Sequence, residues 1–168
     1  LWESNAIIVY LTDLFAEKGL GRSIGDKDRG TYLSWLAWYG NIVEPVLVFT
    51  AAGLNHRYLD ATFRGAPEVA ARLGRSLHEA GEGARARPLL ERAARAGHAD
   101  ASRALAQIAL LSGDRDDAET HARTAVARGG GAEALATLAA VLRAQDRPTE
   151  AAEALVSASE ARGGDAEL

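Results

Sequence analysis

"LAQIALLSGDRDDAETHARTA", residues 105–125, recurs in altered form on both sides of itself. The stretch "LGRSLHEAGEGARARPLLERA" begins 32 residues earlier, at Leu73, and "LAAVLRAQDRPTEAAEALVSA" begins 33 residues later, at Leu138. Matching residues fall into the columns Leu73/Leu105/Leu138, Gly74/Ala106/Ala139, Leu77/Ala109/Leu142, Gly81/Gly113/Asp146, Ala86/Ala118/Ala151, Leu90/Ala122/Leu155 and Ala93/Ala125/Ala158. This period is typical of helix-turn-helix units, which bury their apolar faces by stacking on neighbours. We therefore expect a short solenoid of about three repeats over residues 67–162.

The composition changes abruptly near residues 60–67. All three Trp and all four Tyr precede this region, and Ala, Arg, Glu and Leu dominate after it. We therefore expect residues 1–60 to form a separate unit. Its first helix is predicted from apolar residues at helical spacing, which are Ala6, Ile7, Tyr10, Leu11, Leu14 and Phe15. Ser4 is its expected N-cap, and Gly19 its expected left-handed end.

A second helix is predicted over residues 27–52, with Asp26 as its N-cap. Tyr32, Trp35, Leu36, Tyr39, Val43 and Val46 would form its apolar face. Pro45 cannot donate to the carbonyl of Asn41, so we expect a kink there. The predicted fold class is all-α: a helix pair followed by a short helix-turn-helix repeat solenoid.

The repeats resemble tetratricopeptide repeats in the pattern of Leu, small residue, Gly and Ala described above. The stretch "AARAGHADASRALA", residues 93–106, is similar to the Sel1 variant of these repeats. The resemblance implies a groove that binds a protein or peptide partner. It assigns no individual residue to that partner.

The first unit resembles the glutathione transferase family. The residues that carry this resemblance are "ESNAIIVYL" at 3–11 and "DKDRGTYLSWLAWYGNIVEPVL" at 26–47. The resemblance implies that Glu3 and Ser4 are a vestigial grip for the γ-glutamyl end of glutathione, the first binding its ammonium and the second its carboxylate. The family's thiolate-activating residue lies upstream of Leu1, so no catalytic residue is assigned and glutathione is expected only if that missing half is supplied.

The aromatic set Tyr32, Trp35, Trp38 and Tyr39 has two interpretations. The resemblance implies a pocket for a hydrophobic electrophile, whereas helical spacing favours core or subunit packing. A homodimer through the 27–52 helix is therefore a further expectation.

Composition argues against several classes of function. The 168 residues carry a net charge of −4, which gives no electrostatic reason to expect a nucleic acid or an anionic membrane as partner. No apolar stretch approaches the roughly 18 residues of a membrane span, and the absence of Cys fits a reducing, cytoplasmic location. His56, His78, His98 and His121 are 20 or more residues apart, so no metal site is expected.

Two hypotheses of function remain open. In the first, the chain is a non-catalytic protein-binding scaffold in which a transferase-derived helix pair precedes the solenoid. In the second, it is a fragment of a glutathione transferase whose catalytic N-terminal half is missing. The sequence contains no Met and begins with Leu in mid-pattern, so we expect it to be a piece of a longer protein.

Overall fold

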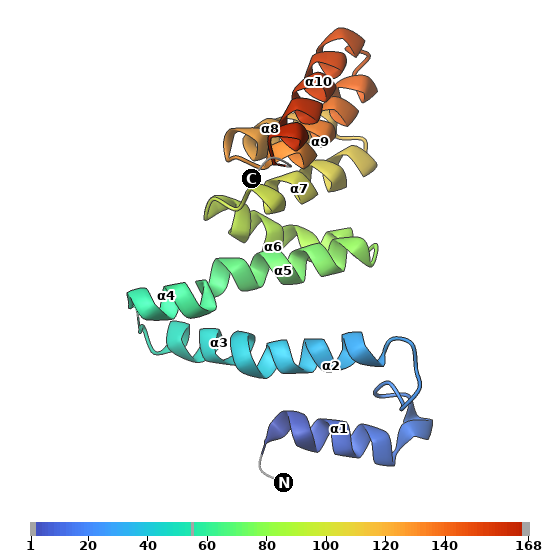
Figure 1. The fold of residues 1–168 in the computed structure, drawn as a ribbon, viewed down its shortest axis with the longest axis vertical. Coiled ribbons are helices and arrows are strands. Elements are labelled where there is room, and N and C mark those ends of the chain that lie inside the picture. Colours follow the sequence, from blue (N-terminus) through green and yellow to red (C-terminus); the bar gives the residue numbers. More distant parts are fainter. Residues whose placement is uncertain (1–2, 55, 166–168) are drawn as a thin grey trace. The chain divides into compact units, whose positions relative to one another are not determined.

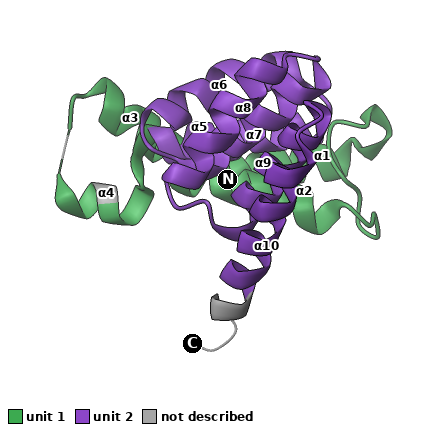
Figure 2. Ribbon diagram, turned by 90° about the horizontal axis from the view of Figure 1, so that it is seen from above, with its two compact units in different colours: residues 1–66 green, residues 67–168 purple. Residues whose placement is uncertain are grey.

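The computed structural model describes residues 3–54 and 56–165, with the side chains of residues 60 and 163–165 outside the description. Every regular element in those residues is helical (Figure 1). This confirms the predicted all-α fold class. Contacts divide the chain into two compact units, unit 1 (residues 1–66) and unit 2 (residues 67–168) (Figure 2).

Unit 1 begins with helix α1, Ser4–Leu14, followed by the 3₁₀ turn η1, Ala16–Lys18. The prediction that Ser4 is the N-cap is wrong by one residue. Glu3 has the extended N-cap conformation (φ −94°, ψ 119°), and its carbonyl accepts from the N–H of Ile7 at 3.0 Å. Ser4 is already helical, and no side chain caps α1. Gly19 is left-handed as predicted (φ 65°), although it ends η1 rather than α1.

The predicted 27–52 helix is an interrupted helical run. Helix α2 (Arg29–Trp38), a π-helical turn η2 (Tyr39–Val43) and helix α3 (Glu44–Ala51) follow one another directly. The kink expected at Pro45 stays a prediction; the structure shows a π turn just before Pro45, in which each N–H bonds to the carbonyl of the fifth residue before it. Because Pro45 has no N–H for the carbonyl of Asn41, a wider turn just before it avoids the missing bond.

The prediction that Asp26 caps the second helix is also wrong. Asp28 is the N-cap of α2, and it makes no side-chain capping bond. Asp26 instead accepts from the N–H of Asp28 at 2.8 Å, so its carboxylate closes a turn before the helix. Helix α4, Arg57–Phe63, follows α3, and its Phe63 ring lies 5.5 Å from the ring of Phe49.

The described residues of unit 2 form three helix pairs. The bounds are α5 (Gly65–Glu79) with α6 (Gly83–Arg95), α7 (Ala99–Leu111) with α8 (Arg115–Ala127), and α9 (Gly131–Ala144) with α10 (Pro148–Asp165). The turn within each pair uses the matching column: Gly81, Gly113 and Asp146 are all left-handed, with φ of 79°, 81° and 59°. Helix α7 packs on α8 and α9 as well as on α6, so the pairs stack on one another.

The core of unit 2 is built from small residues. Six Ala in two repeat columns are at most 5% exposed: Ala86, Ala118, Ala151, Ala93, Ala125 and Ala158. Small side chains at these positions let neighbouring helices approach closely. Leu90 and Ala122 are fully buried, whereas Leu155, in the same repeat column, is 47% exposed. Leu155 is exposed because α10 is the last described helix and no further helix pair packs against it. None of the described helices is both long and apolar enough to cross a membrane.

Candidate functional site

Glu3 and Ser4 lie side by side at the N-terminal end of α1, and both side chains are exposed. The N–H groups of the first helical turn have no acceptor within the helix, so they can donate to an anion at this end of α1. Their proposed role toward glutathione stays a prediction.

The two stretches that carry the resemblance in unit 1 pack against each other. The Asn5 side chain donates from Nδ2 to the carbonyl of Leu36 at 2.9 Å. Gly40 makes this approach possible, because a Cβ there would lie 2.3 Å from the same nitrogen. The Asn5 Oδ1 atom is buried with no hydrogen-bond partner among the described residues. Gly40 is therefore required for the close contact between α1 and the π turn.

A charged pair that the sequence did not reveal joins α1 to α2. Arg29 donates to both carboxylate oxygens of Asp13, at 2.7 and 2.9 Å. These hydrogen bonds lower the pKa of Asp13 and raise that of Arg29. Nearby, the hydroxyls of Thr12 and Tyr32 are hydrogen-bonded at 3.1 Å. The bidentate geometry fixes the pairing of the two helices more firmly than a single contact would.

The four aromatic residues considered as a pocket do not gather into one site. Tyr32 and Trp35 line a cavity of about 370 Å³ together with residues 20–22, Asp28 and Thr31. Trp38 instead packs edge-on against Trp35, with ring centroids 5.2 Å apart. Tyr39 is 50% exposed. Two of these side chains, Tyr32 and Trp35, therefore line a cavity, and Trp35 also packs against Trp38.

In unit 2, a second cavity of about 370 Å³ opens on the side formed by the first helices of the pairs. We call this surface the first-helix face, and its lining residues are Arg103, Gln107, Leu110, Glu133, Ala136, Thr137, Ala140 and Arg162. These residues belong to α7, α9 and α10. They include apolar side chains, two arginines, one glutamate, one amide side chain and one hydroxyl group. Such a mixture suits a peptide segment, which offers both backbone polar groups and side chains.

A ladder of charges runs along the first-helix face. Arg75 of α5 pairs with Asp100 of α7 at 3.4 Å, and Arg103 pairs with Glu133 of α9 at 3.3 Å. The Nε atom of Arg103 is buried and lies 3.7 Å from Asp100, too far for a hydrogen bond. Among the described residues this Nε atom therefore has an ion-pair contact but no hydrogen-bond acceptor.

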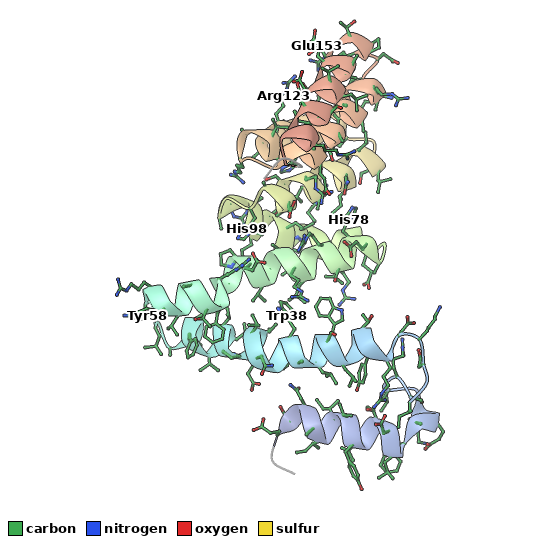
Figure 3. All side chains as sticks on the ribbon, in the orientation of Figure 1. Trp38, Tyr58, His78, His98, Arg123 and Glu153 are labelled. Atoms are coloured by element: carbon green, nitrogen blue, oxygen red, sulfur yellow. The ribbon has the colours of Figure 1, made fainter. Side chains whose placement is uncertain are left out.

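The second helices of the pairs carry a tighter charge cluster. Glu119 of α8 accepts from Arg123 and from Arg147, each at 2.8 Å, and Arg147 also binds Glu150 through both carboxylate oxygens. These donors, Arg123 first, lower the pKa of Glu119 to about 2. Arg123 is labelled in Figure 3. This cluster, Glu119–Arg123–Arg147–Glu150, links the second and third repeats.

The histidines of unit 2 have structural partners. His98 is the N-cap residue of α7 and lies 3.6 Å from Glu68, His121 lies 3.3 Å from Asp117, and His78 is hydrogen-bonded to Gln107 at 3.1 Å. Figure 3 labels His78 and His98 on the ribbon. Within the described ranges, no three His, Asp or Glu side chains are grouped so that they could hold a metal ion.

Comparisons with protein-family models, with curated proteins and with solved structures found no match to this chain. The fold and its surfaces define it at the level of class, as an all-α protein whose second unit consists of stacked helix pairs.

Proposed function

We propose that this chain is a non-catalytic scaffold that binds a segment of a partner protein along the first-helix face. The observation that carries the proposal is the cavity between α7 and α9, lined by both apolar and charged side chains. Stacked helix pairs present extended surfaces of this kind to peptides. The sequence resemblance of residues 67–162 to tetratricopeptide and Sel1-like repeats supports the same function.

The test is a peptide-display selection against the whole chain, followed by affinity measurements on the selected peptides. Ala140 is exposed on the first-helix face, so Ala140→Glu places a charge in the cavity without disturbing the core. We expect this variant to bind at least about tenfold more weakly, because an unpaired charge must be desolvated on binding.

Ala152→Glu is the matched control, since Ala152 is equally an exposed alanine within a helix but belongs to α10. It should bind the selected peptides as tightly as the unmodified chain. Equal affinity of the Ala140→Glu variant, or a selection that enriches no peptide, would contradict the proposal.

A second candidate is that unit 1 is part of a glutathione transferase whose catalytic half is absent from this chain. Its support is the packing of the two motif stretches through Asn5 and Leu36 and through Asp13 and Arg29. Glu3 and Ser4 would then be the retained part of the glutathione grip. On either hypothesis the chain alone should not conjugate glutathione to an aromatic halide. Conjugation above the uncatalysed rate would contradict this expectation.

A further inference from the structure

The two junctions between successive helix pairs of unit 2 differ at the ends where the helices turn. At the second junction, Gln145 is the C-cap of α9 and donates from its Nε2 atom to the carbonyl of Arg115, the first residue of α8, at 3.1 Å. A side-chain carboxamide therefore crosses this junction and binds the start of the neighbouring helix.

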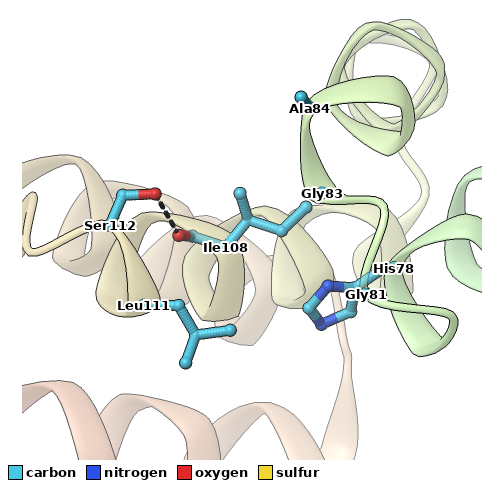
Figure 4. Close-up of a pocket in the computed structure, with 7 residues that line it drawn as sticks. All are labelled: His78, Gly81, Gly83, Ala84, Ile108, Leu111 and Ser112. Carbon is cyan, nitrogen blue, oxygen red and sulfur yellow. Dashed lines mark hydrogen bonds between the residues drawn. The ribbon is translucent and has the colours of Figure 1, made fainter.

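At the first junction, the equivalent positions are Ser112, the C-cap of α7, and Gly83, the first residue of α6. Ser112 does not cross, because its hydroxyl donates to the carbonyl of Ile108 in its own helix at 2.9 Å (Figure 4). Gly83 has no side chain where the second junction has Arg115. These two shorter residues leave a cavity of about 230 Å³, which we call the junction pocket; its walls include His78, Gly81, Gly83, Ile108, Leu111 and Ser112.

The junction pocket has an apolar wall, and the equivalence of the repeats points to a backbone acceptor beside it. Leu111 is 82% exposed at its edge, whereas the matching last residue of α9 is Ala144. Ile108 is only 6% exposed and contributes a further apolar wall. By the equivalence of the repeats, the carbonyl of Gly83 corresponds to the carbonyl of Arg115, which accepts a second hydrogen bond in addition to its helical one.

We propose that the junction pocket binds a primary carboxamide, carried by a Gln or Asn side chain of the partner protein. The amide donates to the carbonyl of Gly83, and the methylene groups pack on Leu111 and Ile108. Gln145 is the internal template for this occupant, because it makes the corresponding bond at the second junction. The proposal rests on the proposed function for the carrier of the amide, but the pocket can be tested without any partner.

The test is a titration of the whole ¹⁵N-labelled chain with butanamide, followed by amide chemical shifts. We expect saturable shifts at the N–H groups of Gly83, Ala84 and Ser112. Butanoate has the same carbon chain but no N–H donor, so it should cause no saturable shift there. Saturation by butanoate, or its absence with butanamide, would overturn the assignment.

Two variants test the mechanism. Ser112→Gln supplies the carboxamide from within the chain, so the butanamide shifts should disappear while the melting temperature does not fall. Ser157→Gln, at an exposed position of α10, is the control and should retain them. Unchanged butanamide binding by Ser112→Gln would refute the proposal. Ala140→Glu should leave the butanamide shifts intact, so failure of the pocket can be distinguished from failure of the first-helix face.

Discussion

Gly74 of α5 and Leu90 of α6 share one site in the core of the first repeat. A Cβ at Gly74 would lie 2.7 Å from Cγ of Leu90 and 2.8 Å from its Cδ2. Leu90 is fully buried, so it has little freedom to move aside. The matching positions of the second repeat are Ala106 and Ala122, two side chains of intermediate size that are both fully buried. In the first two repeats, these two positions therefore compensate for each other in size.

This compensation predicts the outcome of a double-mutant cycle. Gly74→Ala alone should lower the free energy of unfolding by about 1–3 kcal/mol, because it overpacks the site. Leu90→Ala alone should cost about 2–5 kcal/mol through loss of burial and the cavity it leaves. In the Leu90→Ala background, Gly74→Ala should cost nothing or be stabilising, since Ala has the higher helix propensity.

The cycle is measured by urea unfolding of the four proteins. Gly83→Ala is the control, because a Cβ there would lie 3.7 Å from Ile108, at ordinary contact distance. An equal cost of Gly74→Ala in both backgrounds would contradict the proposed steric coupling.

At the scale of elements, α8 is joined to the start of α10 by the Glu119–Arg123–Arg147–Glu150 cluster. The pKa of Glu119 falls from 4.5 to about 2 because Arg123 and Arg147 donate to its carboxylate. A carboxyl group whose pKa is lowered on folding stabilises the folded state above its unfolded pKa. This contribution is complete above about pH 4.5 and is lost as the pH falls towards about 2.

Glu119→Gln removes the titrating group and so tests this linkage. The variant should be less stable than the unmodified chain at neutral pH, and the difference should shrink as the pH falls through that window. Thermal unfolding followed by circular dichroism at several pH values measures it. Glu153→Gln removes the same charge from an exposed position of α10 (labelled in Figure 3) and should show no comparable pH dependence. A difference independent of pH would contradict the linkage.

The helix ends were the least predictable elements. Ser4 and Asp26 are residue types that favour N-caps, yet the caps are Glu3 and Asp28. Capping preference is about 1 kcal/mol, so packing of the following helix can shift its start by a residue or two. Gly81 and Gly113 take positive φ without a Cβ clash, whereas Asp146 takes the same left-handed conformation in the third repeat despite its Cβ.

At the scale of the whole molecule, the two units differ in how much core they bury. In the described part of unit 1, only Val43 and Val46 are buried hydrophobic residues, whereas unit 2 has an extensive buried core. Burial of apolar surface is the main favourable term in folding, so unit 1 should be the less stable unit.

All three Trp lie in unit 1, so their fluorescence reports its unfolding separately. We expect the fluorescence change on urea titration to precede the loss of helical circular dichroism, which reports both units. Coincident transitions for the two probes would show that the units unfold together and would contradict this prediction.

The candidate surfaces were predictable only in outline. The resemblance of the repeats implied a groove, which stays a prediction, and the pairing of Arg103 with Glu133 joins residues on different repeats and has no local sequence signal. The junction pocket likewise has no local sequence signal. It lies where Gly83 and Ser112 are shorter than Arg115 and Gln145, the residues at the equivalent positions of the second junction. That contrast has meaning only once the structure brings the ends of neighbouring repeats together.

The sequence by itself determined the helical class and indicated the repeat period, because both depend on local periodicity. Only the tertiary structure decided the helix starts, the π turn before Pro45, the charge clusters, the cavity of the first-helix face and the junction pocket. These depend on contacts between residues distant along the chain, whose energies exceed the small local preferences that a sequence pattern records.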